Sequence, residues 1–167
     1  MVIGGIGMSI WSGFKRRVNG VLLGWFLTGV FSFGLGISNG LPFWVTFIIL
    51  SSVVAPLVNT SNQAIWQSKV APDVQGRVFS SRRLIAWFSQ PISPLIAGVM
   101  ADRWLEPSMS GGKGLMAALF SGIVGNEPGS GMALLFAVSG VFMALIGLSG
   151  YLIPAIRDVE TNLPDHG

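Results

Sequence analysis

Residues 18–68 read VNGVLLGWFLTGVFSFGLGISNGLPFWVTFIILSSVVAPLVNTSNQAIWQS and contain no Lys, Arg, Asp, Glu or His. A helix needs about 20 mostly apolar residues to cross a hydrocarbon core of roughly 30 Å. This stretch is long enough for two such helices, and the turn-forming residues 38–42 (SNGLP) lie near its middle. The sequence therefore predicts an all-α fold, a polytopic bundle of transmembrane helices.

The composition agrees with a membrane protein and argues against several kinds of chemistry. Charged residues make up 10% of the chain, against about 25% in typical soluble domains. The absence of Cys removes disulfides, thiolate metal sites and cysteine nucleophiles. The apolar segments contain no acidic residue or His, and no complete phosphate-binding glycine loop is present. We therefore expect no enzyme activity, no cofactor, no metal site, no nucleic-acid partner and no proton relay within the spans of this chain.

The apolar segments divide the chain into four full spans and one partial span. We expect a partial bundle over residues 1–154, with spans at about 1–12 (partial), 19–37, 41–62, 84–101 and 131–153. Residues 67–83 form a polar connection, and residues 155–167 form a polar tail. The apolar island 115–124 is too short to cross a bilayer, so we expect it at the interface or against the bundle.

The basic residues are distributed unevenly between the two sides that this span order creates. One side receives Lys15, Arg16, Arg17, Lys69, Arg77, Arg82, Arg83 and Arg157, and the other receives Arg103 and Lys113. Cytoplasmic connections carry an excess of Lys and Arg. We therefore expect the first side and the C-terminus to be cytoplasmic, in a multi-pass protein of the cell (inner) membrane.

Small or polar residues recur at helical spacing along each span. In the first full span they are Gly20, Gly24 and Thr28, and in the last span they are Ala133, Ala137, Gly140, Ala144 and Gly147. Small residues let helices approach closely where lipid supplies no hydrophobic drive. These two sets predict helix packing.

The second and third spans carry amide groups as well as the internal prolines Pro56, Pro91 and Pro94. An unsatisfied polar group within a bilayer costs several kcal/mol, so such groups either line a wet cavity or join helices. The two interpretations have about equal weight. The candidates for lining a substrate path are Asn59, Asn62, Gln63, Trp87 and Gln90.

Residues 61–80 (SNQAIWQSKVAPDVQGRVFS) resemble the signature that joins the tenth and eleventh helices in the macrolide-efflux-like branch of the major facilitator superfamily. Residues 91–98 (PISPLIAG) and 101–103 (ADR) are similar to its eleventh helix and the outer end of that helix. Residues 125–135 resemble the entry to its twelfth helix, and residues 7–17 resemble its basic loop between the eighth and ninth helices. That loop usually carries an Asp before its basic residues, and here no acid is present.

The resemblance implies the C-terminal part of a secondary transporter, from the end of the eighth helix through the twelfth. Such a protein would export small amphipathic or drug-like molecules by alternating access, together with a missing N-terminal half. The alternative is a non-transporting membrane remnant or scaffold module. Candidates for the cytoplasmic loop or gate are Lys15, Arg16, Arg17, Asp73, Gly76, Arg77, Arg82 and Arg83. Asp73 and Arg77 are four positions apart on an expected short helix that starts at Pro72, a pairing worth about 0.3–0.5 kcal/mol when exposed. A solvated loop helix is the favoured interpretation of that pair.

Overall fold

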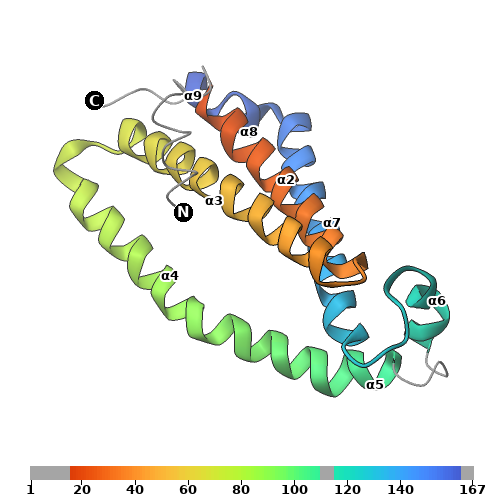
Figure 1. The fold of residues 1–167 in the computed structure, drawn as a ribbon. Helices are drawn as coiled ribbons and strands as arrows, with labels where there is room; N and C mark the ends of the chain where they lie inside the picture. Colours follow the sequence, from red (N-terminus) through yellow and green to blue (C-terminus); the bar gives the residue numbers. More distant parts are fainter. Residues whose placement is uncertain (1–15, 110–114, 163–167) are drawn as a thin grey trace.

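The computed structural model describes residues 16–109 and 115–162, and within those ranges it contains helices and no strand (Figure 1). Four of the helices are long and apolar enough to cross a membrane. The predicted all-α membrane fold is therefore confirmed. The expected partial span 1–12, together with Lys15 and Lys113, lies outside the described residues.

The first two spans form a helical hairpin around a glycine turn. Helix α2 (Arg17–Ile37) and helix α3 (Leu41–Lys69) are separated by the turn that the sequence predicts. Gly40 has φ +107°, a backbone conformation that glycine adopts without steric penalty. Trp44 Nε1 donates a hydrogen bond of 3.0 Å to the Ser38 carbonyl oxygen across the turn.

Helix α3 extends seven residues beyond the predicted span, and helix α4 (Pro72–Met100) begins far earlier than predicted. Residues 63–69 contain no Gly or Pro, so nothing interrupts the helix after its apolar part ends. Only Val70 and Ala71 separate the two helices, because the residue before a proline is driven out of helical conformation. The expected connection 67–83 is therefore mostly helical, and the helix starting at Pro72 is long rather than short.

Helix α4 ends at Met100, one residue before the predicted end of the third span. The chain continues as a π-helical turn, η1 (Ala101–Leu105), and then as α5 (Glu106–Met109). Helix α6 (Leu115–Val124) follows and is too short to span. It packs at the entry to α7 (Ser130–Leu152), in a small apolar core made of Met109, Val124, Leu134 and Ala137.

Glu106 joins this corner to the start of α7. Its two carboxylate oxygens accept hydrogen bonds of 2.7 Å each from the backbone nitrogens of Gly129 and Gly131. Carboxylates near a helix N-terminus satisfy free N–H groups and complement the helix dipole. Beyond α7, the chain breaks at Pro154 and continues as α8 (Pro154–Arg157) and α9 (Val159–Asn162).

Helices α2 and α7 are antiparallel and touch backbone to backbone. A Cβ atom placed on Gly29 would lie 2.6 Å from the Gly140 carbonyl oxygen, and one on Gly36 would lie 2.6 Å from the Ala137 nitrogen. One on Gly147 would lie 2.6 Å from the Phe26 nitrogen. Because residue numbers fall along α7 as they rise along α2, the chain directions are opposite.

The predicted small-residue stripe of the last span therefore faces α2, whereas Gly24 of the first-span stripe packs against α3. Gly24 lies against Val58 of α3, and the Thr28 hydroxyl donates to the Gly24 carbonyl oxygen of its own helix at 2.8 Å. The glycines that meet α7 are Gly29 and Gly36, seven positions apart. This spacing is close to two helical turns and keeps both on one face.

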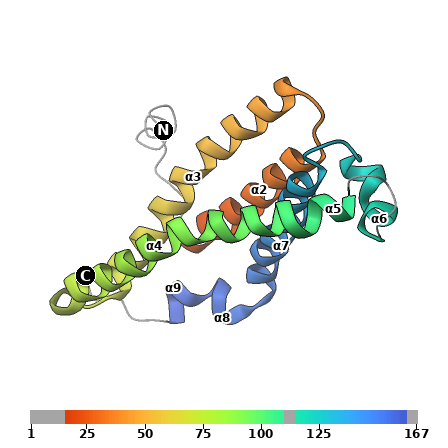
Figure 2. The same ribbon diagram turned by 90° about the horizontal axis from the view of Figure 1, so that it is seen from below.

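Helix α4 lies apart from the other long helices along most of its length and rejoins them at the η1 corner (Figures 1 and 2). In the most apolar segment of α3, and likewise of α4, 6% of the residues are buried. In the corresponding segment of α2, 33% of the residues are buried. The packed part of the fold is therefore α2 with α7 and α3, and the two helices that carry the predicted amide residues remain widely accessible.

Candidate functional site

A cleft of about 790 Å³ lies between the C-terminal half of α3 and the N-terminal half of α4. We call it the α3–α4 cleft. Its walls are rich in amide side chains and contain two arginines and two aromatic rings. The lining residues are Asn59, Gln63 and Gln67 from α3, and Gln75, Gly76, Phe79, Ser80, Arg82, Arg83, Ala86, Trp87 and Gln90 from α4.

The structure brings most, but not all, of the predicted site residues to this cleft. Four of the five path candidates and three of the gate candidates line it, namely Asn59, Gln63, Trp87, Gln90, Gly76, Arg82 and Arg83. Asn62, Asp73 and Arg77 are outside its lining. Within the described chain, no hydrogen bond or ion pair joins Asp73 to Arg77, which agrees with a solvated helix end.

The amide groups divide between the two interpretations that the sequence left open. The Asn62 Oδ1 atom accepts a hydrogen bond of 3.4 Å from Arg82 Nη2, so this side chain joins α3 to α4. Asn59 Nδ2 donates to the Ala55 carbonyl oxygen of its own helix at 3.0 Å. Gln63 and Gln90 line the cleft, and in the described part of the chain their amides make no hydrogen bond.

Arg82 lines the cleft and lies against aromatic rings of both helices. Its guanidinium carbon lies 4.1 Å from the centroid of the Trp66 ring and 6.0 Å from that of Phe79. Both distances permit cation–π attraction, which is favourable where the cation is partly desolvated. The contacts of Arg82 with Trp66 and Asn62 join α4 to α3, whereas its contact with Phe79 lies within α4.

Gln75 supports the same corner through the backbone. Its Nε2 atom donates to the carbonyl oxygens of Gln67 at 3.1 Å and Val70 at 2.9 Å. The last carbonyls of a helix lack partners within the helix, so this side chain satisfies the end of α3. Sequence reasoning missed Gln75, Gln67 and Phe79, although Asn59, Gln63 and Gln67 recur every fourth residue and so share a face of α3.

The prolines of α4 free backbone acceptors beside the cleft. Proline has no N–H, so the helical hydrogen bonds from positions 91 and 94 to the carbonyl oxygens of Trp87 and Gln90 cannot form. Both of these residues line the cleft. Two residues in the α4 wall of the cleft therefore have backbone carbonyls that lack their usual helical donor.

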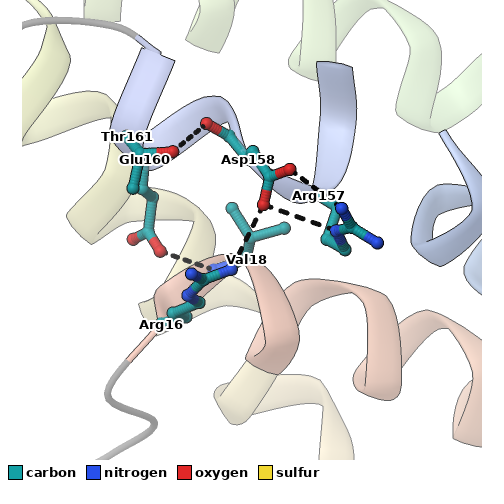
Figure 3. Close-up of polar contacts among 6 residues, drawn as sticks. All are labelled: Arg16, Val18, Arg157, Asp158, Glu160 and Thr161. Atoms are coloured by element: carbon teal, nitrogen blue, oxygen red, sulfur yellow. Dashed lines mark hydrogen bonds and ion pairs between the residues drawn. The ribbon is translucent and has the colours of Figure 1, made fainter. Parts of the chain in front are cut away.

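A second cluster of polar contacts lies where α2 begins, and Figure 3 shows it. Arg16 Nη1 pairs with Asp158 Oδ1 at 3.2 Å. The Glu160 carboxylate accepts hydrogen bonds from the backbone nitrogens of Arg17 at 3.1 Å and Val18 at 3.5 Å. The basic loop has no acid in sequence, and its acidic partners here are Asp158, which lies between α8 and α9, and Glu160 of α9. We call residues 154–162 the tail clasp.

The tail clasp also holds α3. Lys69 Nζ donates to the Glu160 carbonyl oxygen at 2.6 Å, and Arg17 Nη1 donates to the Ala64 carbonyl oxygen at 2.9 Å. Of the expected gate residues, Arg16 and Arg17 therefore belong to this cluster rather than to the cleft. The tail clasp, the start of α2 and the end of α3 all meet at one end of the helices, as the predicted span order requires.

Asp158 carries most of the charge pairing in the tail clasp. Hydrogen bonds from the Arg157 guanidinium, aided by the charges of Arg157 and Arg16, hold the pKa of Asp158 below its ordinary value. A carboxyl whose pKa is lower in the folded state stabilises the fold above the unfolded pKa, about 3.9 for Asp. The Asp158 contribution is therefore present at neutral pH and lost as the pH falls through the folded pKa.

Replacing Glu160 should loosen the first turn of α2, although the Arg16–Asp158 pair would remain. Loss of a side-chain N-cap costs about 0.5–2 kcal/mol, so we expect Glu160→Ala to increase hydrogen exchange at the Arg17 and Val18 amides about tenfold. Glu127→Ala, at an exposed acid near the opposite end of α7, serves as the matched control and should leave those amides unchanged. Equal protection in both variants would contradict the capping role.

Among the described residues, no group of His, Asp or Glu is arranged to hold a metal ion. The chain is similar in sequence to known efflux proteins. The chain is 28% identical over 109 residues to macrolide efflux protein A of Streptococcus pyogenes, a match that covers 62% of this chain and 26% of the relative. The protein of the same name from Streptococcus pyogenes serotype M6 (strain ATCC BAA-946 / MGAS10394) matches to the same extent.

No protein-family model matches the chain. No solved structure matches it. The matched segment spans about a quarter of the length of the efflux proteins. The chain is therefore a helical membrane protein with sequence similarity to an efflux protein.

Proposed function

We propose that this chain is the C-terminal part of a secondary transporter of the major facilitator type, which exports small amphipathic or drug-like molecules by alternating access. The observation that carries the proposal is the α3–α4 cleft, where amides from two membrane helices face a shared space. Polar groups in such a position mark substrate pathways. The similarity to a macrolide efflux protein supports export as the activity, with no enzymatic step.

The accessible amides of the cleft support a second helical half that covers them. Gln63 and Gln90 are in helices that could cross a membrane, and both side chains are accessible. An amide facing lipid would remain unsatisfied at a cost of several kcal/mol. We infer that the open face of α3 and α4 meets the N-terminal half of the transporter, with substrate held between the two halves near the midplane.

The arrangement supports a mechanism in which α4 moves relative to the packed helices. Backbone contact between glycines makes α2 and α7 a rigid pair, whereas α4 rests on the others near its ends. The missing hydrogen bonds at Pro91 and Pro94 make bending of α4 less costly. The spans at 18–68, 84–101 and 130–152 contain no carboxylate, so coupling to protons would use groups in the other half.

The topology proposed for this transporter can be tested in a chain that contains no Cys. We expect Asp73→Cys to react with an impermeant thiol reagent only from the cytoplasmic face, and Asn126→Cys only from the outside. Both positions are exposed and lie at opposite ends of the long helices. Labelling of both from the same side of sealed cells would contradict this topology.

Export is tested with the transporter that contains this chain, expressed in everted membrane vesicles. We expect accumulation of amphipathic dyes that requires an ion gradient and stops when an uncoupler dissipates it. Vesicles containing the same protein with Gly140→Leu, which prevents α2–α7 contact, provide the matched negative control. If vesicles that contain the transporter accumulate no more dye than empty vesicles, with or without a gradient, the proposed transport function is overturned.

A further inference from the structure

The described lining of the α3–α4 cleft carries positive charge and no acidic residue. Arg82 and Arg83 line it, and none of the described residues in its walls is acidic. Along α4, Asp73 precedes these arginines by nine and ten positions, which is about 14–15 Å at 1.5 Å per residue. This separation exceeds the Debye length of roughly 8–10 Å at physiological salt. Asp73 therefore does little to neutralise the cleft.

The other described acids are engaged or distant. Asp158 and Glu160 belong to the tail clasp, where they pair with Arg16 and cap α2. Glu106 caps α7 at the far end of α4, and Asp102 lies in the adjacent η1 turn. None of these described carboxylates lines the cleft.

The contacts of the two arginines orient positive charge without neutralising it. Arg82 lies over the Trp66 ring and bonds to the Asn62 amide oxygen, and both partners are neutral. Arg83 is exposed, and within the described chain it makes no hydrogen bond or ion pair. Two adjacent guanidinium groups at a membrane boundary repel each other, and a bound oxyanion would relieve that repulsion.

We propose that the α3–α4 cleft binds an amphipathic molecule through an oxyanion head group, a phosphate or carboxylate, that pairs with Arg83 and Arg82. Guanidinium groups hold such oxyanions through paired, charge-assisted hydrogen bonds. Trp87, which is 68% exposed, offers apolar surface for the body of the ligand. The Gln90 amide and the free carbonyl of Trp87 can accept hydrogen bonds from that body.

This inference rests on the proposed function, because it treats the cleft as a substrate path. It narrows the substrate class to amphipathic molecules with an anionic head group. A cationic head group would meet Arg82 and Arg83 unfavourably. The oxyanion could belong to a soluble amphipathic molecule or to an anionic phospholipid of the adjacent leaflet. Both sources share the same chemistry at the cleft.

The test uses dodecyl phosphate and dodecyltrimethylammonium as probes, which share a chain length and differ in head-group charge. Binding to the protein in phosphatidylcholine nanodiscs is measured by titration calorimetry. We expect the phosphate to bind at least about tenfold more tightly, and Arg83→Gln to weaken it by about tenfold, as loss of one charged hydrogen-bonding partner predicts. Arg103→Gln, at the other end of the same helical segment, is the matched control and should change affinity less than about twofold.

Equal affinity for the two probes, or equal weakening in Arg83→Gln and Arg103→Gln, would overturn the oxyanion site. Arg83→Lys keeps the positive charge, so it should bind the phosphate probe more tightly than Arg83→Gln does. It also provides a second variant in case Arg83→Gln folds poorly. Repeating the titration in phosphatidylglycerol nanodiscs separates the sources. If phosphatidylglycerol weakens dodecyl phosphate binding in a way that depends on Arg83, the occupant is a lipid. If the affinity for dodecyl phosphate is unchanged, the occupant is a soluble ligand. Both results support the site. Dye export in vesicles is measured independently, so it can succeed where oxyanion binding fails.

Discussion

Gly140→Ala is expected to lower the free energy of unfolding by about 3 kcal/mol, the upper part of the range for overpacked sites. The new Cβ would lie 2.6 Å from the Gly29 carbonyl oxygen, in addition to close contact with the backbone of Phe33. These neighbours are backbone atoms and cannot rotate away. Helices α2 and α7 would have to separate along their whole interface, which is the most extensive contact in the described fold.

Gly122→Ala is the matched control, because a Cβ on this helical glycine meets nothing within 4 Å. Replacing an exposed helical Gly by Ala gains up to about 1 kcal/mol of helix propensity. The two substitutions are chemically identical and should change stability in opposite directions. Unfolding in mixed micelles at increasing denaturing detergent measures both. A Gly140→Ala protein as stable as Gly122→Ala would contradict the α2–α7 packing.

The helical membrane fold was predictable because it depends on the composition of long segments rather than on single residues. The charge-free stretch 18–68 leaves two spans as the only way to remove its apolar surface from water. The ends of α3 and α4 were not predictable in the same way. Residues 63–83 extend both helices beyond the apolar parts, where polar sequence gives no hydrophobic signal for a helix.

The site was partly predictable because amides in a span are conspicuous. Asn62 and Gln63 are consecutive, and successive residues of a helix point about 100° apart. Only Gln63 lines the cleft, and the sequence offers no local reason to prefer it over Asn62. Asn62 instead bonds to Arg82, a partner twenty positions away. The tail clasp was not predictable, because its contact between Arg16 and Asp158 joins distant parts of the chain.

Gln90→Ala is expected to change the relative transport rates of different substrates by about tenfold, equivalent to one hydrogen bond to a bound ligand. The Gln90 amide lines the cleft beside two prolines and makes no hydrogen bond within the described chain. Its removal should therefore leave the melting temperature of the transporter nearly unchanged. Transport of a panel of amphipathic dyes by the full-length protein in proteoliposomes measures this effect.

Asn62→Ala is the matched control for Gln90→Ala. It removes the amide that joins α3 to α4, so it should lower stability by about 0.6 kcal/mol, and by at most roughly 1.7 kcal/mol, the range for hydrogen bonds between membrane helices. Its transport per folded molecule should keep the original substrate profile. The pair thus separates an amide in the cleft from an amide between helices.

The most direct test of the cleft as a substrate path is to measure melting temperature and substrate profile on the same purified preparations of these two variants. We expect an altered profile with an unchanged melting temperature for Gln90→Ala, and an unaltered profile with a lowered melting temperature for Asn62→Ala. A lowered melting temperature with an unaltered substrate profile in Gln90→Ala would contradict the cleft as a substrate path.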